Sequence, residues 1–462
     1  MKILVYPHHL EIGGSQTNAI DLATELRDAH GHDVVFFATP GPAAALLHER
    51  KIRLIPAPAA FGAPSARMIA ALARVVREQR PDVVHAWDWP QCINSLLAFG
   101  PLGVPFAGSD MNNLSVSAHL PKAVPMTFGT EETVDVARGL GHRRLLLLEP
   151  PVDTDRDDPA VVDGETVRAE HGIGADELLV VAVSRLVGWL KLEGLIRGIE
   201  AVGELAGDHP VRFLLVGSGT AEEDLRERAA AVNARVGREV VIVPGPMLDP
   251  RGAYAAADVV LGMGGSALRG LAFGKPVLLT GEKGFSTIVG PDTVAPLFWR
   301  GYYGVGDGTP SDLAGQLADL LGDAALRARL GTWARDLVLD RYSLTVTGRR
   351  LDEFLRDAAE RPPVRAGILR DLAMIAPRAT ASRVVPPAVR NRLRGGSTPT
   401  NWADVAVARG TQDGPSPSRP GGHQAAPTAG AGTSIGSDTT TSSGTTTGAG
   451  AGVGAGRGEG AG

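Results

Sequence analysis

The stretch LLVVAVSRLVGWLKLEGLIRGIEAV, residues 178–202, carries the pattern that decides the fold of this chain. Its first six residues are apolar and rich in valine, as in a strand buried on both faces of a parallel sheet. From residue 192 onward, apolar side chains recur at helical spacing. A buried strand that leads directly into an amphipathic helix predicts an α/β fold with a parallel sheet.

Two cations, Arg185 and Lys191, lie between this strand and this helix. Open α/β sheets bind ligands outside the carboxyl ends of their strands. A planar guanidinium and a compact ammonium, beside a helix start whose N–H groups have no partner within the helix, suit a diphosphate. Taken alone, both cations could also be solvated loop residues.

The composition excludes several classes of protein. At 462 residues, the chain is long enough for two or three domains with large cores. A formal net charge of −5 gives no electrostatic reason to expect a nucleic acid as partner. The single cysteine, Cys92, fits a reducing compartment. Because no signal-peptide pattern occurs and no apolar run reaches the ~18 residues of a membrane helix, we expect a cytoplasmic protein.

Strand and helix patterns alternate over residues 1–150, which predicts one doubly wound, Rossmann-like domain. Strands are expected at 2–6, 33–38, 52–56, 82–85, 104–108, 123–128 and 144–148, and helices at 15–27, 65–79 and 130–140. A segment rich in Pro and Asp then predicts a linker over residues 151–175.

A second alternation over residues 176–342 predicts a second domain of the same kind. Its strands are expected at 178–183, 212–216, 239–243, 258–261 and 276–280, and its helices at 192–205, 221–236, 252–256, 266–273, 311–321 and 324–339. Residues 343–360 predict a terminal helix that packs back on the domains. Two such domains are expected to face each other across a cleft.

The composition changes beyond residue 360. Residues 361–394 hold eight arginines and one acidic residue, Asp371. Four apolar residues of this segment could line one face of a short helix: Ile368, Leu369, Leu372 and Ile375. Such a basic amphipathic segment could dock at the inner face of the plasma membrane, or be a solvated tail or a strap over the protein's own surface. Residues 395–462 have few large apolar side chains, which predicts a disordered tail.

Seven motifs follow one another along residues 1–360 at fitting spacings. They are Gly13-Gly14 with SQTNAIDLATELRDAHGHDV, then RPDVVHAW, LLLLEPPVD, VSRLVGWLKLEGLIRGIEA, FLLVGSGTAEEDL, VVIVPGPM with YAAADVVL, and SALRGLAFGKPVLL. Their order resembles that of the GT-B glycosyltransferases of the large retaining family 4, the group 1 glycosyl transferases. The resemblance implies a GT-B fold and transfer of a sugar from a nucleotide-sugar donor, without a metal and without a cofactor.

The resemblance also implies donor-binding residues. Gly13 and Gly14 would face the donor diphosphate from the first domain, because glycine tolerates positive φ and lets the backbone approach a phosphate. Arg185 and Lys191 would hold the same diphosphate from the second domain and stabilise the charge of the leaving group. Three further glycines are expected near the nucleotide: Gly217, Gly219 and Gly245. A dinucleotide fingerprint is the rival interpretation of the first of these turns, but its third glycine position holds Glu222.

The chain departs from the family near the donor sugar. The family commonly has two glutamates there, and Leu261 and Arg269 occupy their positions. Arg269 could contact a phosphate or a carboxylated sugar, or face solvent. The loop between these positions could present backbone N–H groups to the sugar or β-phosphate, or be a tight turn. Its candidate residues are Gly264, Gly265 and Ser266.

A second departure concerns the acceptor side, where Ser109-Asp110 stands in the place of a histidine common in the family. Polar side chains are expected at several strand carboxyl ends in the same cleft: His8, His9, Glu11, His85, Asp88 and Asp110. We expect Asp110, with His9 or His85, to bind the acceptor hydroxyl and remove its proton.

The resemblance thus implies a retaining glycosyltransferase, which we expect to act in glycan, cell-envelope or glycoconjugate biosynthesis. Its acceptor would be a hydroxyl of a glycan, a lipid-linked glycan or a small molecule. The alternative is a GT-B fold that has lost transfer activity and serves as a binding or scaffold subunit, which the departures at Arg269 and Ser109 motivate. The donor base and the donor sugar stay open, because donor specificity lies in the loop that departs from the family.

Overall fold

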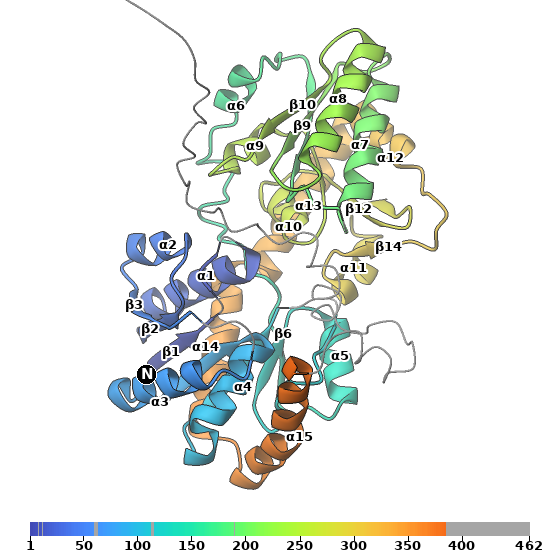
Figure 1. Ribbon diagram of the computed structural model, residues 1–462. Helices are drawn as coiled ribbons and strands as arrows, with labels where there is room; N and C mark the ends of the chain where they lie inside the picture. The colour runs from blue at the N-terminus through green and yellow to red at the C-terminus, as the bar shows by residue number, and fades with distance from the viewer. Residues whose placement is uncertain (8, 12, 60–62, 112–114, 189, 385–462) are drawn as a thin grey trace, which may run out of the picture. The chain divides into compact units, whose positions relative to one another are not determined.

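The computed structural model describes residues 1–384 apart from 8, 12, 60–62, 112–114 and 189. In this part of the chain, the strands form two largely parallel sheets with helices packed against them (Figure 1). The predicted doubly wound α/β architecture is confirmed. The predicted tail, residues 395–462, lies outside the described residues.

The first sheet is parallel throughout its described strands, in the order β3-β2-β1-β4-β5-β6-β7. The strand order reverses between β1 and β4, and at such a switch point open sheets bind ligands beyond the strand carboxyl ends. The strands are β1 (Lys2–Tyr6), β2 (Asp33–Ala38), β3 (Arg53–Pro56), β4 (Val83–Trp87), β5 (Phe106–Asp110), β6 (Met126–Phe128) and β7 (Leu145–Leu147). The helices are α1 (Gly14–Asp28), α2 (Ala44–Glu49), α3 (Ala66–Gln79), α4 (Asp88–Phe99), the 3₁₀ helix η1 (Gly100–Leu102) and α5 (Glu131–Gly139).

The second sheet has the order β10-β9-β8-β11-β12-β13, with β13 antiparallel and β14 paired with β12. The strands are β8 (Leu178–Val183), β9 (Val211–Val216), β10 (Val241–Gly245), β11 (Val259–Gly262), β12 (Val277–Glu282), β13 (Ser286–Ile288) and β14 (Gly304–Val305). The helices are α6 (Glu165–Glu170), α7 (Leu192–Leu205), α8 (Glu222–Val236), α9 (Arg251–Ala256), α10 (Gly265–Ala272), α11 (Val294–Arg300), α12 (Leu313–Gly322) and α13 (Ala324–Arg341).

Strand β8 shows why the stretch 178–202 folds in this way. Its alternate side chains enter two different hydrophobic clusters, because strand neighbours point to opposite faces of a sheet. Val180 packs with Leu195 and Ile199 of α7 in one cluster, whereas Leu179 and Val181 belong to the other. A strand that is covered on both faces therefore needs the continuous apolar run seen in the sequence.

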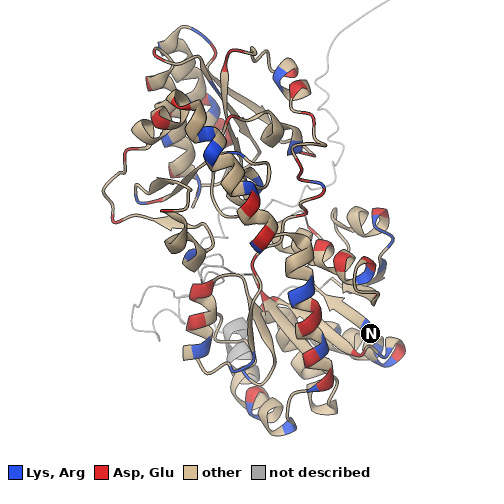
Figure 2. Ribbon diagram, turned by 180° about the vertical axis from the view of Figure 1, so that it is seen from behind, with Lys and Arg blue, Asp and Glu red and all other residues tan. Residues whose placement is uncertain are grey.

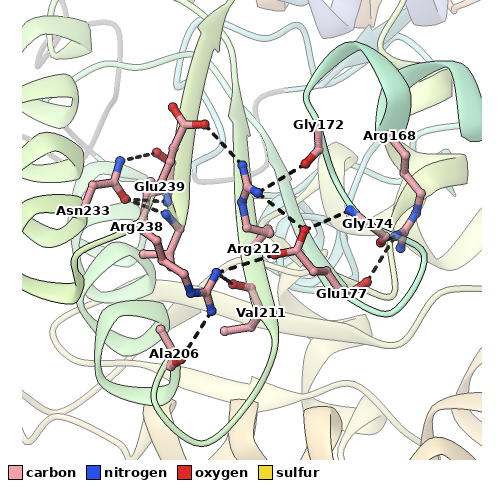
Figure 3. Close-up of polar contacts among 12 residues, drawn as sticks. Arg168, Gly172, Gly174, Glu177, Ala206, Val211, Arg212, Asn233, Arg238 and Glu239 are labelled. Carbon is pink, nitrogen blue, oxygen red and sulfur yellow. Dashed lines mark hydrogen bonds and ion pairs between the residues drawn. The ribbon is translucent and has the colours of Figure 1, made fainter.

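At the amino edge of the second sheet, arginines are paired with carboxylates (Figure 3). Arg212 donates to Glu177 and Glu239 at 3.4 and 3.2 Å. Arg168 of α6 donates to Asp258 at 2.6 Å, so the end of the predicted linker packs on the second sheet. Elsewhere, acidic and basic residues are interspersed along the helices rather than gathered by sign (Figure 2).

Two C-terminal helices, α14 (Leu344–Glu360) and α15 (Arg365–Val384), pack on the first domain. Helix α14 lies against α1, and α15 lies beside α4 (Figure 1). In α15, Ile368 and Ile375 are buried, and Asp371 accepts a hydrogen bond from the Ala123 N–H at 2.7 Å. Two of the four apolar residues of the predicted face therefore pack on the protein's own surface, as the strap interpretation expects, whereas Leu369 is 58% exposed. No helix among the described residues is long and apolar enough to cross a membrane.

Candidate active site

The segment 184–191, between β8 and α7, carries the two predicted cations. Arg185 is exposed, and Lys191 is half-buried at the start of α7, whose first N–H groups have no side-chain cap. Burial and the neighbouring charge of Arg185 lower the pKa of Lys191 to about 8. Within the described ranges neither cation pairs with a carboxylate, in contrast to Arg168 and Arg212. Two adjacent unpaired cations at an uncapped helix start form a site that favours an anion.

Backbone packing against the turn after β9 fixes the first part of this segment, residues 184–186. Gly217 has a φ of +151°, and a Cβ there would lie 1.8 Å from the carbonyl oxygen of Ser184. Gly219 has a φ of +154°, and a Cβ there would lie 2.2 Å from the carbonyl oxygen of Leu186. The Leu186 N–H in turn donates to the Ser218 carbonyl at 2.9 Å. Both glycines are therefore required to seat the loop that carries Arg185, and their contact with a nucleotide stays a prediction.

The other diphosphate glycines start α1. Gly13 has a φ of −168°, an extended conformation that any residue adopts, so the expectation of a positive φ is wrong for this position. The next residue, Gly14, borders open space, because a Cβ there would meet no atom within 4 Å. The start of α1 also has no side-chain cap. At the end of β10, the Gly245 carbonyl accepts the Gly217 N–H at 3.0 Å, which ties two of the predicted nucleotide turns together.

The glycine-rich loop before α10 is largely closed on itself. The Gly264 N–H donates to the Tyr302 carbonyl at 2.9 Å, so it is not available to a sugar or phosphate. The Ser266 hydroxyl accepts the Met263 N–H at 3.1 Å and so closes the turn. The hydrogen bonds at Gly264 and Ser266 are those of a tight turn, and contact of these two residues with the donor stays a prediction. Gly265 is exposed with open space around it and stays a candidate for donor contact.

Arg269 lies in the last turn of α10 and forms an ion pair with Asp157 at 3.5 Å. Burial raises the pKa of Asp157, and the charge of Arg269 opposes this rise. The charge of Arg269 is thus balanced by a carboxylate of the protein itself. The sequence did not suggest Asp157 as its partner. The Arg269 side chain is still 40% exposed, so a contact with the donor stays a prediction.

His85 is buried among polar side chains of the first sheet. Strand β4 runs to Trp87, two residues beyond its predicted end, and His85 is therefore enclosed in the sheet at 1% exposure. Its Nε2 lies 2.7 Å from the hydroxyl of Ser109, which lies 2.7 Å from the hydroxyl of Thr127. Burial lowers the pKa of His85 to about 3, so this histidine is neutral. His85 thus belongs to a buried network that joins β4, β5 and β6, and its catalytic role stays a prediction.

Other acceptor-side candidates do lie at strand carboxyl ends. Asp110 is the last residue of β5 and is 2% exposed. Asp88 begins α4 with a φ of +61°, and its carboxylate accepts the Met111 N–H at 3.2 Å, next to Asp110. His9 is half-buried beyond β1, whereas His8 lies outside the described residues. Across the described ranges, no three His, Cys, Asp or Glu residues are placed to hold a metal ion.

An aromatic pair near these carboxylates was not anticipated from the sequence. Trp89, in the first turn of α4, contacts the ring of His119 with centroids 5.1 Å apart. Both side chains are half-buried, so part of each ring is accessible. Helix α4 is absent from the helices expected from the sequence, and its Pro90 is tolerated because proline fits the first turn of a helix. A proline in the first turn of a helix is therefore the sequence feature that could have placed Trp89 at a helix start beside Asp88.

Two family models match the chain. Residues 12–110 match the model described as Glycosyltransferase Family 4, and residues 177–323 match Glycosyl transferases group 1. The chain belongs to the group 1 glycosyltransferases. The first match covers α1 to β5 and the second covers β8 to α12, so each family model falls on the elements of one sheet.

Solved glycosyltransferases have the same fold as this group 1 glycosyltransferase. A glycosyltransferase from Rickettsia africae is 17% identical with a TM-score of 0.62, over 78% of this chain and 99% of that one. HepE from Anabaena, in complex with UDP-glucose, is 19% identical with a TM-score of 0.58, over 77% and 100%. Sucrose-phosphate synthase from Thermosynechococcus elongatus is 16% identical with a TM-score of 0.55, over 77% and 99%. A comparison with curated protein sequences gives no match.

Proposed function

We propose that this glycosyltransferase moves a sugar, with retention and without a metal, from a nucleotide-sugar donor to a hydroxyl acceptor. The observation that carries the proposal is the pair Arg185 and Lys191, unpaired within the described residues at the uncapped start of α7. A nucleoside diphosphate leaving group would supply the anion that this site favours, and its developing charge would be stabilised there. The complex of Anabaena HepE with UDP-glucose supports a donor of this class. Retention rests on the family resemblance.

The first domain would contribute to both substrates. We propose that the open start of α1, at Gly13 and Gly14, approaches the same diphosphate. Asp110 is the proposed acceptor of the hydroxyl proton, with His9 as the alternative. The Trp89 side chain packs partly on the core of the first sheet, and its accessible part is the proposed contact for a sugar ring of a glycan or lipid-linked glycan acceptor.

The proposal is tested by donor binding. UDP-, GDP-, ADP- and dTDP-sugars are screened for thermal stabilisation and then for hydrolysis and transfer. A ligand at 100 times its Kd stabilises the folded state by ~2.7 kcal/mol, which a thermal shift detects. We expect one base to give a shift and the matching sugar to be transferred. If no nucleotide sugar shifts the melting temperature while a protein partner binds, the scaffold interpretation replaces the proposal.

Donor affinity is expected to weaken above pH 8. Lys191 binds a diphosphate only when protonated, and its pKa in the free protein is lowered to about 8. A bound anion raises this pKa, so affinity is constant below pH 8 and falls by up to about tenfold per unit above it. Titration calorimetry between pH 6.5 and 9.5 measures the curve. The Lys191→Arg variant keeps its charge and should give a flat profile; an equally steep profile in that variant would assign the effect to another group.

Replacement of Trp89 by alanine is expected to raise the acceptor KM by about tenfold, the order of one lost aromatic contact. The donor KM should be unchanged, because Trp89 follows β4, whereas the proposed donor contacts follow β1 and β8. Steady-state kinetics with each substrate varied in turn separates the two constants. Trp89→Phe, which keeps an aromatic face, is the matched control. Equal effects on both KM values would contradict a role confined to the acceptor.

A further inference from the structure

The segments that follow β8 and β12 are joined by hydrogen bonds between backbone and carboxylate. The Leu190 N–H donates to Oε1 of Glu282 at 3.3 Å. In the opposite direction, the N–H groups of Lys283 and Gly284 donate to the carboxylate of Glu193 at 2.8 and 2.5 Å. Each segment therefore supplies one glutamate that binds the backbone of the other.

Both segments contain a non-glycine residue with left-handed backbone. Leu190 has a φ of +62° and Lys283 a φ of +53°. Side chains other than glycine rarely adopt this conformation unless the surroundings hold it. The amides that the two glutamates bind include those of Leu190 and Lys283 themselves. The two carboxylates thus hold the backbone at Leu190 and Lys283, where the left-handed conformation is unfavourable without such contacts.

The sheet itself does not fix these segments against each other, because β11 lies between β8 and β12. Lys191 follows Leu190 directly and starts α7, so the direction of its side chain depends on how Leu190 is held. Glu282 forms no ion pair with Arg185 or Lys191 among the described residues. It can therefore hold the loop through a backbone amide without neutralising the cations.

We propose that Glu282 and Glu193 form a reciprocal clamp that sets the position of Lys191, and that Glu282 is a positioning residue for the donor diphosphate. The inference rests on the proposed function, because it assumes that Arg185 and Lys191 bind that diphosphate. Neither glutamate is assigned a contact with the reacting atoms. The clamp accounts for two left-handed residues that the family resemblance leaves unexplained.

Binding of inorganic diphosphate to the full chain, measured by calorimetry, tests the clamp without knowledge of the donor. Glu282→Ala removes the acceptor of the Leu190 amide and should weaken binding about tenfold. Glu282→Gln keeps an oxygen at that place and should stay within about twofold of the wild type. Hydrogen exchange of the Leu190 amide should become faster in Glu282→Ala and stay slow in Glu282→Gln. Glu227→Ala, an exposed carboxylate of α8, is the control.

A second substitution separates backbone restraint from charge. Glycine adopts a φ near +62° without strain, so Leu190→Gly in the Glu282→Ala background should recover part of the binding. The clamp is overturned if Glu282→Ala binds diphosphate like the wild type, or if Glu282→Gln is as weak as Glu282→Ala. Arg185→Ala and Lys191→Ala are measured in parallel. If these two bind normally, the diphosphate site itself is rejected; if they lose binding and Glu282→Ala does not, the clamp alone fails.

Discussion

Replacing Arg185 or Lys191 by alanine is expected to lower sugar transfer by about ten- to a hundredfold while the protein stays folded. Each cation would make a charge-assisted hydrogen bond to the leaving diphosphate, and the loss of one such partner costs ~1.5–3 kcal/mol of transition-state binding. Neither side chain pairs with a carboxylate within the described residues, so its removal leaves no buried charge behind. Transfer kinetics with the donor found in the screen measures the effect.

A surface arginine of the same domain provides the control for these two variants. Arg228 lies half-buried on α8 with a side chain 42% exposed, and pairs with Asp224 at 3.0 Å, four positions earlier on the same helix. Such surface pairs contribute ~0.2–1 kcal/mol, so Arg228→Ala should transfer sugar at the wild-type rate. Melting temperatures of all three variants establish that they are folded. Near-full activity of both Arg185→Ala and Lys191→Ala would refute the proposed donor site.

Local patterns were sufficient to predict most of the fold. Strand β8 and helix α7 have the bounds expected from their apolar periodicity, Leu178–Val183 and Leu192–Leu205. Both elements pack into hydrophobic clusters, and burial of that kind requires apolar residues at strand or helix spacing. The pattern that defines each element is therefore present in its own sequence. The placement of Arg185 and Lys191 together followed from the same reasoning, because the loop between a strand and its helix lies at the sheet's carboxyl edge.

The errors concern contacts between segments that are distant in sequence. Nothing near Arg269 in the sequence indicates that Asp157 will pair with it. From the sequence, the Gly264 amide is available to a ligand, but in the structure it donates to the Tyr302 carbonyl. His85 was expected at the carboxyl end of a strand, but β4 continues to Trp87 and the hydroxyl of Ser109 gives the imidazole a buried partner. The sequence therefore predicts the roles of polar side chains least well. A polar side chain can be buried when it has a hydrogen-bond partner, and that partner often comes from a distant segment.

Arg341→Ala is expected to destabilise the protein by about 3–5 kcal/mol, because it leaves a buried carboxylate without its partner. Arg341 ends α13 and donates to both oxygens of Glu149 at 3.0 and 2.9 Å, and to Glu131 of α5 at 2.9 Å. Its guanidinium also lies over the ring of Phe298, 4.0 Å from the centroid. Glu149 is only 2% exposed. Urea unfolding followed by tryptophan fluorescence measures the loss.

The pH dependence of this loss identifies its cause. Burial already raises the pKa of Glu149, and Arg341 opposes the rise, so removal of the arginine should raise that pKa further. A folded-state pKa above the unfolded value of about 4.3 means that the variant loses stability as pH rises through the folded-state pKa. The variant should therefore be closest to the wild type near pH 5 and furthest from it at pH 8. Adding Glu149→Leu removes the unpaired charge and should restore most of the stability at pH 8. A loss that is independent of pH and unaffected by Glu149→Leu would instead point to the packing of Arg341 on Phe298.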